Sequence, residues 1–209
     1  MARPRNQEKR RDELRRAAVR AFTEASARVR IRDVAEQAGL SPASVLYYYP
    51  DVDDLVAEAF QHATERFYAR RYAQLESIDD PRLQLRTTIE GGFPTDKDDE
   101  EVLMLYVGVP VIRRNPAVAS LVRSLTARQV SLYQTILEVG RAREVFDLAD
   151  DSLTIARNLV ALEDAYGLYV VNGATPDMVD DARRLTLAYA TMATGCDVTE
   201  GALESTSGG

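Results

Sequence analysis

The segment from Arg30 to Leu55 constrains the fold of this chain most, because it contains two short helical patterns hinged on one glycine. The apolar residues of the first pattern recur at i, i+3, i+4 and i+7, and they are Ile31, Val34, Ala35 and Ala38. This spacing predicts a single apolar stripe on a helix near 32–38. Gly39 follows, where a left-handed cap forms most easily without a Cβ.

The second pattern predicts a short helix near 42–48. Ser41 can cap this helix, and Pro42 suits its first position, where no backbone N–H is needed. The helix begins with small residues that let a backbone approach DNA closely, and Asp51 with Asp54 indicates the start of a third helix. This layout is typical of a helix-turn-helix, whose second helix enters a DNA major groove.

The distribution of charge agrees with a DNA-binding head. The net charge of −7 argues against nucleic acid when it is taken alone. However, residues 1–50 hold 11 Lys or Arg and 6 Asp or Glu, whereas the remainder holds 15 and 27. A basic head on an acidic body is expected when only one end meets phosphate, and chance clustering of solvated charge is the alternative.

The rest of the chain also shows helical periodicity, and no segment sustains the alternation of a strand. We predict an all-α fold of about nine helices, with a basic arm over residues 1–8 and a helix from about Lys9 to Ala25. The later helices are expected near 52–75, 82–90, 100–113, 116–141, 153–171 and 176–195. The predicted domains are a DNA-binding head over 1–52, a helical bundle for effector binding and dimerisation over 53–195, and a disordered tail over 196–209.

The segment from Leu153 to Val171 is apolar nearly all round, so a helix there must be covered on every side. One side can pack on its own body, and we expect the other to pack on a second copy, with the last helix beside it. Two copies would then form a four-helix bundle around a two-fold axis. The alternative is a buried central helix in a monomer.

Residues from about Arg15 to Leu55 resemble the TetR family of bacterial transcriptional repressors, and the run from Glu144 to Val170 is similar to the subgroup of choline-responsive repressors. The resemblance implies a homodimer whose two heads bind successive major grooves of a pseudopalindromic operator in double-stranded DNA. A small molecule in each body would release the DNA, although an activator with the same head is an alternative.

The resemblance also implies DNA-binding positions, which are Arg3, Arg5, Arg30, Arg32, Pro42, Ala43, Ser44, Tyr47 and Tyr48, while Tyr49 is expected in the core. The sequence departs from the family pattern at Arg30, where a capping Thr is usual, at Leu46, where a Tyr is usual, and at Val52, where a phosphate-binding Lys is usual. Because Leu46 and Val52 remove two contacts to the DNA backbone per head, we expect either a smaller dependence of DNA affinity on salt than in a typical relative or a larger contribution from the N-terminal arm.

The effector site is expected among the helices after Val52. Its candidate residues are Phe60, Phe67, Tyr72, Phe93, Met104, Tyr106, Tyr133, Glu163, Asp164 and Tyr166. Glu163 and Asp164 point about 100° apart on a helix, so at most one is expected to face a pocket. Aromatic rings with a carboxylate suit a cationic amine, and an aromatic or hydrophobic compound is the alternative. The structural alternative is a carboxylate that pairs with an arginine such as Arg157.

Other classes of protein fit the sequence poorly. His62 and Cys196 are the single His and Cys of the chain, and neither lies in a recognised nucleophile or metal-ligand motif. We therefore expect no enzyme, cofactor or metal, and an all-α enzyme is a remote alternative. The longest near-apolar run, 102–112, is too short to span a bilayer, so no membrane association is expected. The single cysteine suits a reducing cytoplasm, which is the expected location.

Overall fold

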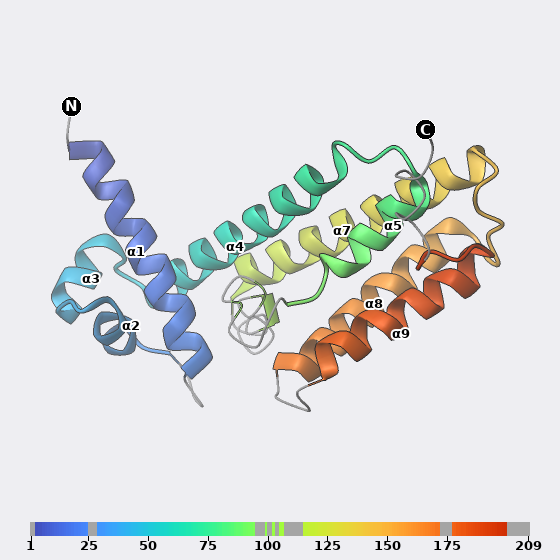
Figure 1. Cartoon of the computed structure of the whole chain (residues 1–209). Coiled ribbons are helices and arrows are strands. Elements are labelled where there is room, and N and C mark those ends of the chain that lie inside the picture. The colour runs from blue at the N-terminus through green and yellow to red at the C-terminus, as the bar shows by residue number, and fades with distance from the viewer. Residues whose placement is uncertain are drawn as a thin grey trace, which may run out of the picture. The chain divides into compact units, whose positions relative to one another are not determined.

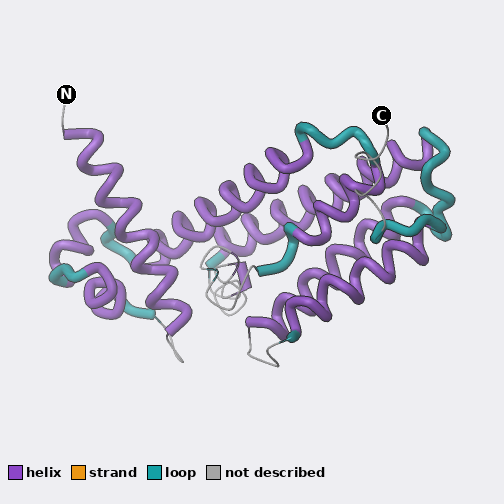
Figure 2. Tube along the Cα trace, in the orientation of Figure 1, coloured by secondary structure: helices purple, strands orange, loops and turns teal. Residues whose placement is uncertain are grey.

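The computed structural model describes residues 3–24, 29–94, 99, 102, 105–106, 115–171 and 177–199. Within these ranges every regular element is a helix (Figures 1 and 2). The helices are α1 (Arg3–Glu24), α2 (Ile31–Ala38), α3 (Pro42–Tyr48), α4 (Val52–Leu75), α5 (Pro81–Glu90), α7 (Pro116–Ala142), α8 (Ser152–Val171) and α9 (Met178–Thr194). The prediction of an all-α fold with about nine helices is confirmed. No described helix is long and apolar enough to cross a membrane.

The largest difference from the expected helix bounds lies at the N-terminal end. Residues 3–8 belong to α1, so the prediction of a separate arm over residues 1–8 is wrong. Pro4 lies in the first turn, where its missing N–H leaves no hydrogen bond unmade. The helix expected over 100–113 lies mostly outside the described residues, although residues 102, 105 and 106 are helical.

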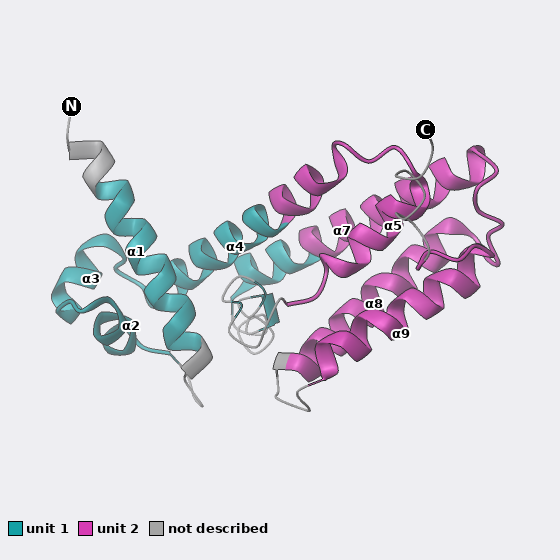
Figure 3. Cartoon of the chain, in the orientation of Figure 1, with its two compact units in different colours: residues 1–67, 98–123 teal, residues 68–97, 124–209 magenta. Residues whose placement is uncertain are grey.

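The chain divides into two compact units (Figure 3). Unit 1 comprises residues 1–67 and 98–123, and unit 2 comprises residues 68–97 and 124–209. The first part of α4 and the start of α7 therefore belong to unit 1, and the rest of both helices belongs to unit 2.

The core of unit 1 forms where α1, α2, α3 and the first turns of α4 meet. Its fully buried side chains include Leu14 and Ala18 from α1, Val34 from α2 and Val45 from α3, and α4 adds Leu55. Tyr49 follows α3 and is 3% exposed, so its predicted place in the core is confirmed. The guanidinium carbon of Arg11 lies 5.0 Å from the centroid of its ring.

The core of unit 2 gathers apolar side chains from α5, α7, α8 and α9. Its fully buried members include Leu85, Leu137, Ala156 and Leu159. Residues 196–199, which were assigned to the predicted tail, are described, and Val198 is 1% exposed in this core. The backbone carbonyl of Thr199 accepts a hydrogen bond from Arg86 at 2.8 Å. The remaining tail residues lie outside the described ranges.

Candidate functional site

The turn between α2 and α3 forms as its sequence predicts. Gly39 has φ 63° and ψ 34°, the left-handed conformation that glycine adopts without a Cβ clash. The N–H of Leu40 donates to the carbonyl of Ala35 at 2.9 Å, which satisfies a carbonyl at the end of α2. The hydroxyl of Ser41 accepts a hydrogen bond from the N–H of Ser44 at 3.2 Å, so Ser41 caps α3. These local contacts fix where α3 begins.

One face of α3 is exposed to solvent and the opposite face is buried. Pro42 and Ala43 are exposed, Leu46 is 44% exposed and Tyr47 is 74% exposed. Residues three and four apart share a helix face, so these four side chains form one continuous surface, which we call the α3 face. Ser44 and Tyr48 are only half-buried, and their predicted contact with DNA stays a prediction.

Two exposed cationic side chains lie at the start of α2, at the other end of this helix from the turn. Arg30 and Arg32 are both exposed, and Arg32 Nε lies 3.4 Å from Asp33 Oδ1. Arg30 precedes α2 and has no acceptor with which to cap it, but its backbone N–H donates to the Asp33 carboxylate at 2.8 Å. The positive end of the helix dipole also stabilises a carboxylate in the first turn of a helix. The start of α2 is therefore stabilised although the usual capping residue is replaced.

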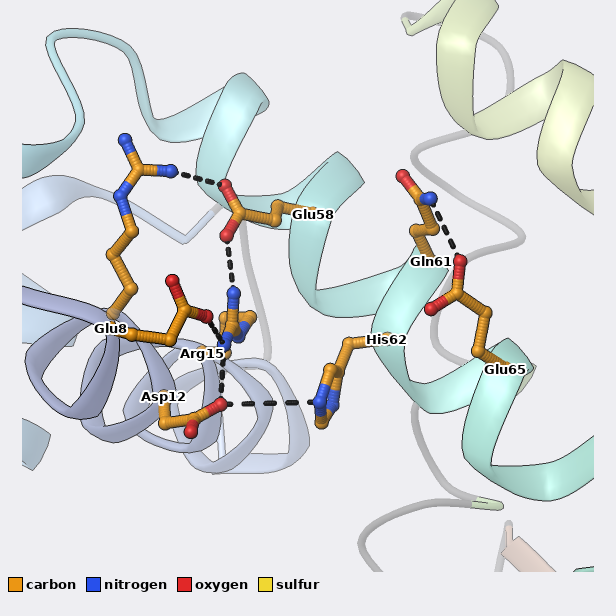
Figure 4. A network of polar contacts seen from close by, with 8 residues as sticks. Glu8, Asp12, Arg15, Glu58, Gln61, His62 and Glu65 are labelled. Atoms are coloured by element: carbon orange, nitrogen blue, oxygen red, sulfur yellow. Dashed lines mark hydrogen bonds and ion pairs between the residues drawn. The ribbon is translucent and has the colours of Figure 1, made fainter. Parts of the chain in front are cut away.

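An ion-pair cluster joins α1 to α4 within unit 1 (Figure 4). Arg15 donates to Glu58 at 2.5 Å and to Glu8 at 2.8 Å, and it also donates to Asp12. His62 Nε2 lies 3.9 Å from the Asp12 carboxylate. The hydrogen bond from Arg15 lowers the pKa of Asp12 below its ordinary value. Because Arg15 is only 8% exposed, its ion pairs fix α1 against α4.

A pocket of about 290 Å³ opens beside this cluster. It is lined by Arg15, Arg16, Val19, Ala59, His62, Ala63, Arg66 and Asp99. None of the effector-site candidates is among these residues. No group of His, Cys, Asp or Glu within the described ranges is placed to hold a metal ion.

Unit 2 contains a buried polar cluster that joins α4, α5, α7 and α8. Arg71 donates to Glu163 Oε1 at 3.0 Å and to Glu163 Oε2 at 3.2 Å, and the hydroxyl of Tyr133 donates to the same carboxylate. Arg71 also donates to the carbonyl of Thr88 at 2.6 Å. Arg71 and Glu163 are each 1% exposed, and Tyr133 is fully buried. We call Arg71, Tyr133 and Glu163 the buried triad.

The surroundings of the triad leave its carboxylate little freedom. A Cβ placed on Gly92 would lie 2.0 Å from Glu163 Oε1, so only glycine fits beside the carboxylate. Burial raises the pKa of Glu163, and the charge of Arg71 and the hydrogen bond from Tyr133 oppose this shift. Burial likewise raises the pKa of Tyr133.

The sequence did not identify the arginine partner of Glu163. The sequence suggests Arg157 as a partner for the carboxylate, but Arg157 is exposed and Arg71 forms the ion pair with Glu163. A signal for Arg71 exists in the sequence, because it continues the apolar face of α4 that runs through Phe60, Ala63 and Phe67. An arginine in register with an apolar stripe indicates a buried cation, and such a cation requires a buried anion.

The structure places the effector-site candidates in both units. Phe93, Tyr133, Glu163 and the half-buried Tyr166 belong to unit 2, where they accompany its core. Phe60 lies in the core of unit 1, which accounts for its burial without a ligand. Phe67 is 1% exposed and Tyr106 is half-buried, and both belong to unit 1. Tyr72 and Asp164 are exposed. Met104 and the side chains of Arg3 and Arg5 lie outside what the structure describes.

Comparison with known proteins identifies the head. Residues 14–59 match the family of bacterial regulatory proteins of the tetR family. No curated protein matches the chain.

Solved structures match the fold over most of the chain. A putative transcriptional regulator from Saccharomonospora viridis in complex with choline has a TM-score of 0.82 at 24% identity and covers 90% of this chain and 98% of that one. A putative TetR-family regulator from Rhodococcus sp. has a TM-score of 0.77 at 23% identity and covers 88% and 98%. FadR from Bacillus subtilis in complex with stearoyl-CoA has a TM-score of 0.69 at 16% identity and covers 88% and 97%. Residues 14–59 therefore carry the domain of the tetR family of bacterial regulatory proteins, on a fold shared with solved transcriptional regulators.

Proposed function

We propose that this chain is a ligand-responsive transcriptional repressor that binds a pseudopalindromic operator as a homodimer and is released by a small molecule. The observation that carries the proposal is the exposed α3 face, in a head that also exposes Arg30 and Arg32 and that matches the tetR family. Apolar and aromatic side chains on a short helix gain little by facing water, whereas the base edges in a DNA groove offer them a contact surface. The exposed arginines can contact the phosphates.

The DNA-binding proposal predicts a loss of affinity when the α3 face is truncated. We expect Tyr47→Ala and Arg32→Ala each to weaken binding to the DNA upstream of the chain's own coding region by roughly 10- to 100-fold, because one good base contact contributes about 1–3 kcal/mol. Fluorescence anisotropy at a fixed salt concentration measures the effect. Tyr72→Ala and Arg82→Ala are the matched controls, because both residues are exposed and lie outside the head.

The affinities of the head variants and of the control variants together distinguish a DNA-binding module from other classes of protein. Unchanged affinity in both head variants would contradict the proposed surface, whereas equal losses in the control variants would indicate a nonspecific effect. If Arg32 contacts a phosphate rather than a base, its variant will lose affinity equally on all DNA sequences. The slope of log affinity against log salt concentration will then become shallower by about one.

Dimerisation is proposed from the exposed apolar side chains of α8 and α9. These two helices pack against each other in unit 2 (Figure 1). Leu168 and Tyr169 on α8 are 41% and 50% exposed, and Leu185 and Met192 on α9 are 37% and 69% exposed. Four large apolar side chains on one helix pair are typical of a surface that a second copy covers.

This interface predicts a charge-sensitive dimer. We expect Leu168→Glu and Met192→Glu each to raise the dissociation constant of the dimer by roughly 100-fold or more, because a two-fold axis places each buried charge in the interface twice. Sedimentation velocity over a concentration series measures the change. Tyr72→Glu is the control, and a dimer that resists both α8 and α9 substitutions would contradict the interface.

The proposed effector is an aromatic or hydrophobic compound rather than a free cationic amine. The choline-bound structure is similar to this chain in fold, but here Arg71 already pairs with the Glu163 carboxylate. An ammonium ligand would therefore have to displace a buried guanidinium or rely on aromatic rings alone. Thermal shift with choline, tetramethylammonium and neutral hydrophobes tests this choice, and stabilisation by the two cations alone would reject it.

A further inference from the structure

The α3 face has a chemical composition that restricts which bases it can read. Helix α3 has the sequence PASVLYY and contains no Arg, Lys, Asn, Gln, Asp or Glu. Its exposed members are the apolar side chains of Pro42, Ala43 and Leu46 and the ring of Tyr47. A helix presented to a major groove with this surface therefore carries methyl groups, methylene groups and one exposed phenol.

Each base presents a different edge in the major groove. Guanine is recognised by paired donors from Arg or Lys, adenine by the amide of Asn or Gln, and cytosine by the carboxylate of Glu or Asp. Thymine alone carries a C5-methyl group, which apolar side chains contact. Helix α3 lacks every side chain in the first three classes, and the hydroxyl of Ser44 already shares a hydrogen bond of 2.8 Å with the hydroxyl of Ser41. Thymine is therefore the base whose edge the apolar surface of α3 complements.

Leu46 lies at the centre of this argument. Val45 is fully buried and Tyr48 is half-buried, so the inner face of α3 is already packed without Leu46. Leu46 remains 44% exposed and lies one turn after Pro42 on the same face. Tyr47 is held beside it, because its ring meets the ring of Tyr48 edge-on at 5.1 Å between centroids. The apolar surface is thus presented by a helix that Ser41 caps.

We propose that Leu46 reads thymine methyl groups in each half-site of the operator. This inference rests on the proposed function and adds the chemistry of sequence recognition to it. Contacts to guanine, where the operator has them, come from outside α3, and Arg30 and Arg32 are exposed cations of the same unit. The proposal therefore places A·T pairs where α3 lies.

Replacing thymine by uracil tests the proposal directly, because this change removes the C5-methyl group and leaves base pairing intact. An operator is first selected from random duplex DNA with the full-length protein, and the thymines of one half-site are then replaced singly. We expect one or two positions at which uracil weakens binding about fourfold, which is the effect of removing one buried methyl group from contact. Substitution in both half-sites should multiply the loss.

The variant Leu46→Ala makes the test specific to this side chain. At the sensitive positions, Leu46→Ala should reduce the penalty for uracil to less than about twofold, whereas Arg32→Ala should weaken binding and keep that penalty. Leu46 is exposed, so the variant is expected to fold, and its melting temperature checks this point.

The outcomes distinguish a failure of the thymine-reading inference from a failure of the proposed DNA-binding function. A protein that selects no operator overturns the proposed function and this inference together. A protein that selects an operator but tolerates uracil at every position overturns the inference alone. A penalty for uracil that persists in Leu46→Ala also overturns it, because another group would then contact the methyl.

Discussion

Replacing Glu163 by alanine is expected to lower the free energy of unfolding by about 3–5 kcal/mol, because Arg71 would keep a buried charge without its counter-ion. Both side chains are 1% exposed, so water cannot reach Arg71 to replace the carboxylate. Single domains are stable by only about 5–15 kcal/mol, and the variant should lose a large part of that margin. Urea denaturation followed by circular dichroism measures the loss as a lower midpoint.

Two further variants separate the pair from its neighbours. In Arg71→Met combined with Glu163→Gln both charges are absent, and we expect this double variant to be more stable than Glu163→Ala. Arg82→Ala breaks an exposed pair with Asp80 and should change stability by no more than about 1 kcal/mol. A loss below about 1 kcal/mol for Glu163→Ala would contradict the role assigned to the buried triad.

The elements of the head could be predicted from the sequence because local contacts fix them. Helix α3 begins and ends where the sequence predicts, since Ser41 caps it and Pro42 occupies its first turn. Gly39 ends the preceding helix through its own backbone conformation. Each of these signals acts within a few residues, so a single sequence is enough to detect it.

The three successive tyrosines lie in three different environments. Tyr47 is 74% exposed and Tyr48 is half-buried at the end of α3, whereas the buried Tyr49 follows the helix with an extended backbone of φ −137° and ψ 95°. The prediction of Tyr49 in the core followed from the resemblance to the TetR family, which has a buried aromatic residue at this position. Which of the other two faces DNA depends on how α3 packs against its neighbours, and a one-dimensional pattern does not contain that information.

The buried triad could not be assembled from the sequence because its members are far apart along the chain. Arg71 and Glu163 are separated by 92 positions, and the register between α4 and α8 decides that they meet. Glu163 itself was identifiable as a carboxylate within an apolar helix, which requires a partner. Arg157 was the nearest cation in sequence, but it points to solvent, and packing rather than proximity selected Arg71.

The second large effect is expected at Gly92, where replacement by alanine should cost at least about 3 kcal/mol. The added Cβ would lie 2.0 Å from Glu163 Oε1 and 2.3 Å from its carboxyl carbon. The carboxylate cannot retreat without losing its hydrogen bonds to Arg71 and Tyr133, so overpacking here also breaks the triad. Urea denaturation again gives the change in the free energy of unfolding.

Gly91 supplies the matched control, because alanine there meets the side-chain oxygen of the exposed Gln74 at 3.0 Å and the backbone carbonyl of Thr87 at 3.2 Å, neither of them as close as the contacts at Gly92. That side chain can move, so we expect Gly91→Ala to change stability by no more than about 1 kcal/mol. Combining Gly92→Ala with Glu163→Ala removes the colliding carboxylate, and the double variant should be more stable than the sum of the two losses predicts. Additive losses would mean that Gly92 does not act on Glu163, because residues in contact are coupled and independent ones are not.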